Sequence, residues 1–138
     1  MDLPEYSTSG AAGFDLRAAH DAVVYPNGMA IVDTGLAFEI PEGYEMQIRP
    51  RSGLSAKTKL RVANSPGTID SDFRGSVKII IDNIYDKNAT GLDAIRINAG
   101  ERIAQGVIAP VLQVEFEEVE ELDETERGEG GLGSTGKK

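Results

Sequence analysis

The residues best suited to chemistry lie together in one twelve-residue stretch, Asn64 to Gly75. It combines turn formers, two carboxylates, an aromatic ring and a guanidinium. Pro66-Gly67 is typical of a turn, and an apolar strand is predicted from Gly75, so we expect a tight hairpin. The Asp70 carboxylate, with Arg74 four residues on to keep it ionised, suits the orientation or deprotonation of a water molecule. The alternative is that the acids only cap the turn.

A second stretch, Arg49 to Ser55, has the composition of an anion site. It contains two guanidiniums, two hydroxyls and a glycine at the predicted start of a short helix. Free N–H groups at a helix start and a planar arginine fork both suit phosphate oxygens. The alternative is a helix N-cap flanked by surface arginines.

Two further polar side chains stand where a ligand can approach. Asp15 lies among small residues, where it could hold a metal-bound water, although an ion pair with Arg17 is the alternative. Gln105 opens a predicted strand after a turn, and its amide suits a phosphate oxygen if it faces a cleft. The alternative is a solvated glutamine.

The last stretch, Arg127 to Lys138, contains five glycines and follows an acidic spacer. That composition favours disorder. Its arginine, hydroxyls and backbone N–H groups would nevertheless wrap a polyphosphate well, with ordering only when the ligand is bound. It lacks the spacing of a Walker A motif.

The elements that position these stretches are mainly short strands. One or two helical turns are predicted around Ser55 to Leu60, and alternation predicts apolar residues on both faces of the strand around Ile80, which indicates an interface. Many short strands separated by turns indicate a sandwich or barrel. The predicted strands are Ala22 to Tyr25, Ala30 to Leu36, Tyr44 to Ile48, Ser76 to Tyr85, Ala94 to Ile97, Arg102 to Ala109 and Val111 to Val119.

Composition bounds the class of protein. A chain of 138 residues, 40% hydrophobic, accommodates one domain, predicted over residues 1–120, and a tail over 121–138. It has no cysteine and a single histidine, His20, which excludes thiolate and histidine-cluster metal sites. Neither a signal peptide nor a membrane-length apolar run is present, so we expect a soluble cytoplasmic protein without membrane contact.

The net charge of −9 argues against direct nucleic-acid binding. Eight of the 23 acidic residues lie between Glu115 and Glu126, and the remaining 15 nearly balance the 14 basic residues. A small anionic ligand is therefore compatible with the rest of the chain.

In this order and spacing, the five stretches resemble the five motifs of the trimeric dUTPase (deoxyuridine 5′-triphosphate nucleotidohydrolase) family, from Ala12 to Lys137. The resemblance implies an all-β jelly roll and a homotrimer with three shared active sites. It implies a hydrolase that converts dUTP to dUMP and pyrophosphate, keeps uracil out of DNA and supplies dUMP for dTMP synthesis.

The resemblance also implies roles for particular residues. Asp70 would be the general base, and Asp15 would hydrogen-bond a water of a Mg²⁺ ion held mainly by the triphosphate. Phe73 would pack on the deoxyribose. The positions matched to phosphate contacts are Arg51, Ser52, Gly53 and Gln105; those matched to uracil are Asn64, Gly67, Thr68 and Ile69; those of the closing tail are Arg127, Leu132, Gly133, Ser134 and Thr135.

Two positions depart from the family pattern. Phe73 stands where a tyrosine is usual, and Leu132 stands where a ring normally stacks over uracil. A deoxycytidine triphosphate deaminase, which would need a catalytic glutamate near the hairpin, and a nucleotide-binding module without turnover are the alternative functions.

Overall fold

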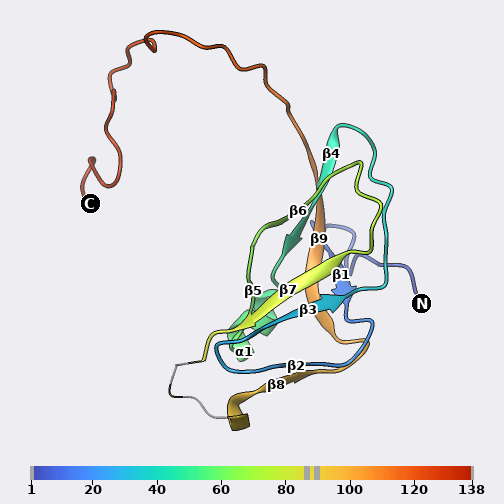
Figure 1. The fold of residues 1–138 in the computed structure, drawn as a ribbon. Coiled ribbons are helices and arrows are strands. Elements are labelled where there is room, and N and C mark those ends of the chain that lie inside the picture. The colour runs from blue at the N-terminus through green and yellow to red at the C-terminus, as the bar shows by residue number, and fades with distance from the viewer. Residues whose placement is uncertain (1, 86–87, 89–90, 138) are drawn as a thin grey trace.

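The computed structural model describes residues 2–85, 88 and 91–137. In this part of the chain short strands dominate, with one α-helix and one 3₁₀ turn (Figure 1). In chain order the elements are β1 (Phe14–Arg17), β2 (Ala22–Val24), β3 (Met29–Asp33), β4 (Tyr44–Arg49), α1 (Ser52–Lys57), β5 (Leu60–Val62), β6 (Gly67–Ile69), β7 (Lys78–Asn83), η1 (Gly91–Asp93), β8 (Ile95–Ile97) and β9 (Arg102–Pro110).

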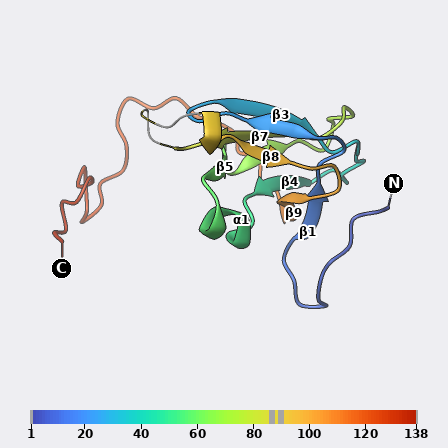
Figure 2. The same ribbon diagram turned by 90° about the horizontal axis from the view of Figure 1, so that it is seen from below.

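The strands form three antiparallel sheets. The largest has the order β1-β9-β4-β6, the second β3-β7-β5, and the third pairs β2 with β8. Figure 2 shows β3 and β7 lying over β4, β9 and β1, so that two layers enclose the core. The prediction of an all-β jelly roll with one short helix is confirmed.

Alternation along the strands builds that core. In β7, Ile79 and Ile81 are buried, while Ile80 between them is half-buried on the outer face. Ile80 pairs with Ile31 of β3, and Ile31 is exposed. The sequence prediction of apolar residues on both faces of this strand is therefore confirmed, and the outer face is left uncovered in a single chain.

Several predicted boundaries are wrong. The predicted strand over Val111 to Val119 does not form; after β9 the chain leaves the body as an extended arm (Figure 1). Val111 still donates a hydrogen bond to Gly43, but Phe116 is 95% exposed. An alternating sequence is not enough for a strand, because the backbone groups of a strand must also pair with a neighbouring strand. No strand of the described chain pairs with this segment.

Three short strands and the helix also differ from expectation. The strands predicted from the sequence do not include β1, β5 or β6. Helix α1 begins three residues earlier than predicted, directly after Arg51. This shift matters because it brings Ser52 and Gly53 into the first helical turn.

Candidate active site

One half of the candidate site is built across three strands. Arg49 of β4 is paired with Gln105 of β9, which is paired in turn with Asp15 of β1. Directly paired residues of antiparallel strands point to the same face of the sheet. In the next row, the buried Phe14 ring fills the space beside Gly106, which anchors β1 to β9 and fixes the position of Asp15.

Asp15 is the anionic centre of a cluster of arginines. Arg51 Nε donates to Asp15 Oδ1 at 2.9 Å, and Arg102 Nη1 approaches Asp15 Oδ2 at 3.4 Å. The side chains of Asp15 and Arg51 are only 20% and 26% exposed. Because two guanidiniums contact one carboxylate, the cluster keeps an excess of positive charge that suits a phosphate chain.

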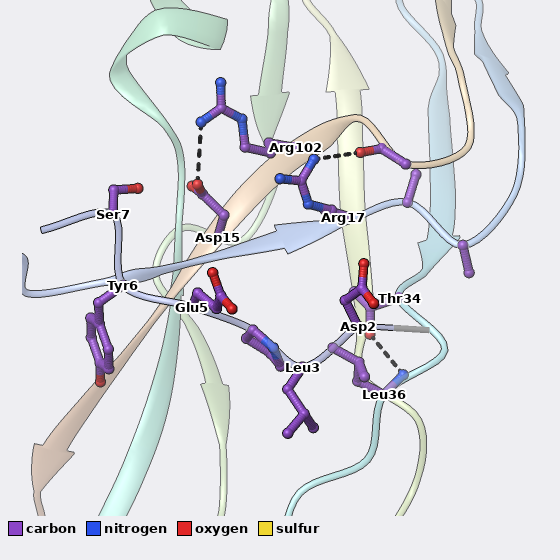
Figure 3. Close-up of a pocket in the computed structure, with 14 residues that line it drawn as sticks. Asp2, Leu3, Glu5, Tyr6, Ser7, Asp15, Arg17, Thr34, Leu36 and Arg102 are labelled. Atoms are coloured by element: carbon purple, nitrogen blue, oxygen red, sulfur yellow. Dashed lines mark hydrogen bonds and ion pairs between the residues drawn. The ribbon is translucent and has the colours of Figure 1, made fainter.

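The alternative pairing of Asp15 with Arg17 is wrong. Arg17 Nη1 donates to the carbonyl oxygen of Gly100 at 2.8 Å, as Figure 3 shows. Arg102, to which the sequence analysis gave no role, contacts Asp15 instead. No local signal reveals this contact, because 87 residues separate the two partners.

The turn between β4 and α1 carries the other predicted phosphate contacts. Gln105 Nε2 donates to the carbonyl oxygen of Pro50 at 2.9 Å, immediately before Arg51. Ser55 N donates to Arg51 O at 3.1 Å and closes the first helical turn. Ser52 and Gly53 are exposed there, and nothing lies within 4 Å of the position of a Cβ on Gly53. This turn is therefore open to a ligand.

The segment from β5 to β6 forms the other half of the site. The predicted tight hairpin is wrong, because β6 pairs with β4 while β5 and β7 belong to another sheet. Gly67 is buried and pairs with Ile48; a Cβ on it would lie 3.1 Å from Ile48 Cβ and 3.4 Å from Asn64 Nδ2. The absence of a side chain at Gly67 lets β6 lie close to β4. Thr68 is exposed and Ile69 half-buried.

Asp70 is exposed where β6 ends. Phe73 N donates to the Asp70 carbonyl at 3.1 Å, which closes the following turn. The Phe73 ring is 43% exposed and lies against Gly75, where a Cβ would come within 2.6 Å of it. An aromatic face is thus available beside Asp70.

Arg74 does not pair with Asp70 as predicted. Its Nη1 donates to the carbonyl oxygens of Ser71 at 2.7 Å and Phe73 at 3.3 Å. Among the described residues Asp70 forms no ion pair. The arginine therefore stabilises the shape of the turn through these two carbonyl contacts.

Asp33, not singled out by the sequence, anchors the segment that leads into β7. The Ser76 hydroxyl donates to Asp33 Oδ1, and Gly35 N donates to the same oxygen at 2.7 Å. Both hydrogen bonds lower the pKa of the Asp33 carboxyl below its usual 3.8, and the bond from Ser76 has the larger effect. They tie the segment entering β7 to the end of β3.

The two halves border different hollows. The first is a pocket of about 750 Å³ beside the N-terminal segment, and its lining includes Asp15, Arg17, Thr34 and Arg102 (Figure 3). The second is a pocket of about 770 Å³, and its lining includes Tyr44 and Asp70.

The strand register explains this separation. Asp70 follows Ile69, which is paired with Met46, whereas Arg51 lies two residues beyond Arg49 at the other end of β4. At about 3.3 Å per strand residue, the Cα atoms of Asp70 and Arg51 lie at least on the order of 15 Å apart.

The glycine-rich tail also lies away from both halves (Figure 1). Arg127 Nε donates to Gly130 O at 2.8 Å, and Ser134 N donates to Gly131 O at 3.0 Å, so the tail forms turns of its own. Leu132 has a φ of 47° and is fully exposed, and Gly133 and Thr135 are exposed beside it. One chain by itself does not bring the tail onto the site.

The described residues contain no group of three side chains able to ligate a metal. Among the described residues, Asp15 is the carboxylate that forms ion pairs with Arg51 and Arg102. This donor set fits Mg²⁺, which usually keeps several waters and takes one or two carboxylates together with substrate phosphates. Within the described residues, no helix is both long and apolar enough to span a membrane.

Comparison with known proteins defines the family. The family model described as dUTPase matches residues 1–136, so the chain belongs to the dUTPase family. The deoxyuridine 5′-triphosphate nucleotidohydrolase of Bdellovibrio bacteriovorus is 56% identical over 138 residues, covering 99% of this chain and 89% of the relative. That of Hydrogenobaculum sp. is 55% identical over 137 residues, covering 99% and 91%.

Solved structures agree. The Staphylococcus bacteriophage 80alpha dUTPase with dUPNHPP has a TM-score of 0.86 and 36% identity, covering 98% of this chain and 92% of the phage chain. A mutant dUTPase from phage phi11 of S. aureus, described with a structural Mg(II) ion, has a TM-score of 0.77 and 31% identity, covering 87% and 90%.

Proposed function

We propose that this chain is a dUTP diphosphatase, which hydrolyses dUTP to dUMP and pyrophosphate. Family membership over residues 1–136 supports the reaction. The observation that carries the assignment to particular residues is the cluster of Arg51 and Arg102 around Asp15 beside an open turn. Guanidinium groups and free backbone N–H groups both donate hydrogen bonds to phosphate oxygens, so this arrangement suits a triphosphate.

In the proposed reaction, Asp70 accepts a proton from the water that attacks the α-phosphorus. The bond between the α-phosphorus and the bridging oxygen breaks, and pyrophosphate leaves. The exposed carboxylate has no ion-pair partner among the described residues, so both its oxygens are free to hold that water. Water activation of this kind contributes about 10²–10⁴-fold in rate.

Arg51, Ser52, Gly53 and Gln105 would contact the phosphates. Bound Mg²⁺ would neutralise phosphate charge and orient the triphosphate. Asp15 would hydrogen-bond a metal-bound water, and this would loosen its 2.9 Å contact with Arg51 and free that guanidinium for phosphate.

The segment from Asn64 to Ile69 would bind the base. Asn64 and the backbone of Gly67, Thr68 and Ile69 would hydrogen-bond uracil. The close packing of β6 on β4 would leave a narrow slot that disfavours a 5-methyl group. Phe73 would pack on the deoxyribose. This aromatic face would reject a 2′-hydroxyl by leaving it without a partner.

We also propose a homotrimer with shared active sites. The separation of Asp70 from Arg51 along β4 supports this, because a triphosphate held by Arg51 would lie far from Asp70 of the same chain. Apolar side chains left exposed on one chain support it as well. They are Met29, Ile31, Leu112, Val114 and Phe116. Arg127, Leu132, Gly133, Ser134 and Thr135 would close over the site from another chain.

A product assay tests the function. Purified protein is incubated with dUTP or dCTP and Mg²⁺, and pyrophosphate and ammonia are measured. Pyrophosphate from dUTP is expected. Ammonia from dCTP would indicate a deaminase, and nucleotide binding without either product would indicate a binding module; either result overturns the proposal.

A further inference from the structure

Gly13 lies where a side chain would collide with a predicted phosphate contact. A Cβ at this position would lie 2.4 Å from Gln105 Oε1 and 3.2 Å from Gln105 Cδ. The Gln105 side chain therefore occupies the space that any other residue at position 13 would need. Gly13 precedes Phe14, the first residue of β1, so this contact joins the start of that strand to β9.

Backbone conformation does not account for this glycine. Gly13 does not have a positive φ angle. Among the described residues, positive φ angles occur at Asn27, Gly35, Gly43, Gly100, Gly128, Leu132, Gly133 and Gly136. An L-amino acid at position 13 thus meets no left-handed strain. What excludes a side chain is the neighbouring glutamine.

The position of Gln105 matters because of its own contact. Its Nε2 donates to Pro50 O at 2.9 Å, and this carbonyl belongs to the peptide that joins Pro50 to Arg51. Arg51 in turn donates to Asp15, the residue paired with Gln105 across β1 and β9. Gly13, Gln105, Pro50, Arg51 and Asp15 form one chain of contacts that ends at the anion-binding turn.

We propose that Gly13 is a positioning residue for phosphate binding. The missing side chain allows the Gln105 amide to hold the Pro50 carbonyl, and this contact presents Arg51, Ser52 and Gly53 to the substrate. The inference rests on the proposed function for its substrate. It adds a role for a residue that would not touch the nucleotide.

The geometry separates this role from a role in stability. The closest atom to a Cβ at Gly13 is the end of a flexible side chain, while the nearest backbone atom, Gly106 O at 3.2 Å, is a tight contact that needs a shift of only a few tenths of an ångström. Gln105 can rotate out of the way at little cost, whereas its hydrogen bond to Pro50 is lost. Gly13→Ala should therefore affect substrate binding much more than folding.

The test is a double-mutant cycle with Gly13→Ala and Gln105→Ala. We measure kcat/KM for dUTP, the Kd of a non-hydrolysable imido analogue of dUTP, and Tm. Each single change should lower kcat/KM and weaken analogue binding about tenfold, as expected for one lost hydrogen bond and a displaced turn. Tm should fall by less than about 4 °C, the shift that corresponds to about 1 kcal/mol in a domain of this size.

The double variant decides the mechanism. If Gly13 acts through Gln105, adding Gly13→Ala to Gln105→Ala should change kcat/KM by less than about twofold. Gly10→Ala is the matched control, because nothing lies within 4 Å of a Cβ there, and it should match the wild type in all three measurements.

Equal fold-losses from Gly13→Ala in both backgrounds would overturn the inference, as would a silent Gly13→Ala. If Gly13→Ala does not fold, Gln105→Met keeps the chain length and removes the amide; an unchanged kcat/KM in that variant overturns the inference. A wild type that releases no pyrophosphate from dUTP overturns the proposed function instead, and analogue binding then still tests the contact.

Discussion

Complementation between two inactive variants tests the proposed sharing of sites. Asp70→Asn removes the base, and Arg51→Gln removes a guanidinium from the phosphate cluster. Asp70 directly follows Ile69 of β6, which is paired with Met46 near the start of β4. Arg51 follows the opposite end of β4, two residues after Arg49. Because this separation is on the order of 15 Å, we expect the two groups that act on one substrate to come from different chains.

The expected magnitude follows from random assembly. Each variant alone should have almost no activity. In an equal mixture that is denatured and refolded together, a site has an intact Asp70 with a probability of one half and an intact Arg51 from another chain with a probability of one half. About one quarter of the sites are then complete, so kcat per chain should recover to roughly 25% of the wild type.

The assay is pyrophosphate release from dUTP with Mg²⁺. Wild type refolded with Asp70→Asn is the control for refolding yield, and it should give about half of the wild-type activity. Light scattering should give a trimer mass for every sample. No recovery above the single variants, in a mixture whose control reaches one half, would refute the reasoning, because each site would then take both groups from one chain.

The remaining predictions concern single positions and the tail. Asp70→Asn should abolish turnover while analogue binding stays within about tenfold, because an amide positions water but does not accept its proton; substantial turnover would contradict the assignment. Deletion of Arg127 to Lys138 should leave the circular dichroism spectrum unchanged and collapse kcat, since the tail adds nothing to the core; a normal kcat would show that the tail is not needed. Leu132→Phe should lower KM by up to about tenfold, because a ring stacks on uracil better than leucine does; equal KM values for Leu132→Phe and Leu132→Ala would mean that the residue does not touch the base. The lowered pKa of Asp33 predicts that its contribution to stability is present above about pH 3.8 and is lost as the pH falls through the folded-state pKa. The difference in Tm between wild type and Asp33→Ala should therefore shrink in acid, and a constant difference from pH 6 to pH 2 would argue against a charged Asp33 in the anchor.

The amino-acid sequence by itself determined the elements whose signals are local. The alternation of Ile79, Ile80 and Ile81 predicted β7 and its half-covered outer face, and both are present. Pro66-Gly67 predicted a turn before the short strand that leads to Asp70, and β6 is present there. These features depend on neighbouring residues along the chain, where hydrophobic periodicity and turn chemistry act directly. The tight hairpin predicted around Asp70 is wrong, because β6 pairs with β4 while β5 and β7 belong to another sheet.

Tertiary structure alone decided the contacts of the charged residues. Asp15 is two residues from Arg17 but pairs with Arg51 and Arg102, because the order β1-β9-β4 brings those arginines to it. The segment from Val111 to Val119 has a strand pattern but forms no strand, and no strand of the described residues pairs with it. Hydrogen-bonding and charged groups need a partner in space, and that partner is chosen by packing between segments far apart in the sequence.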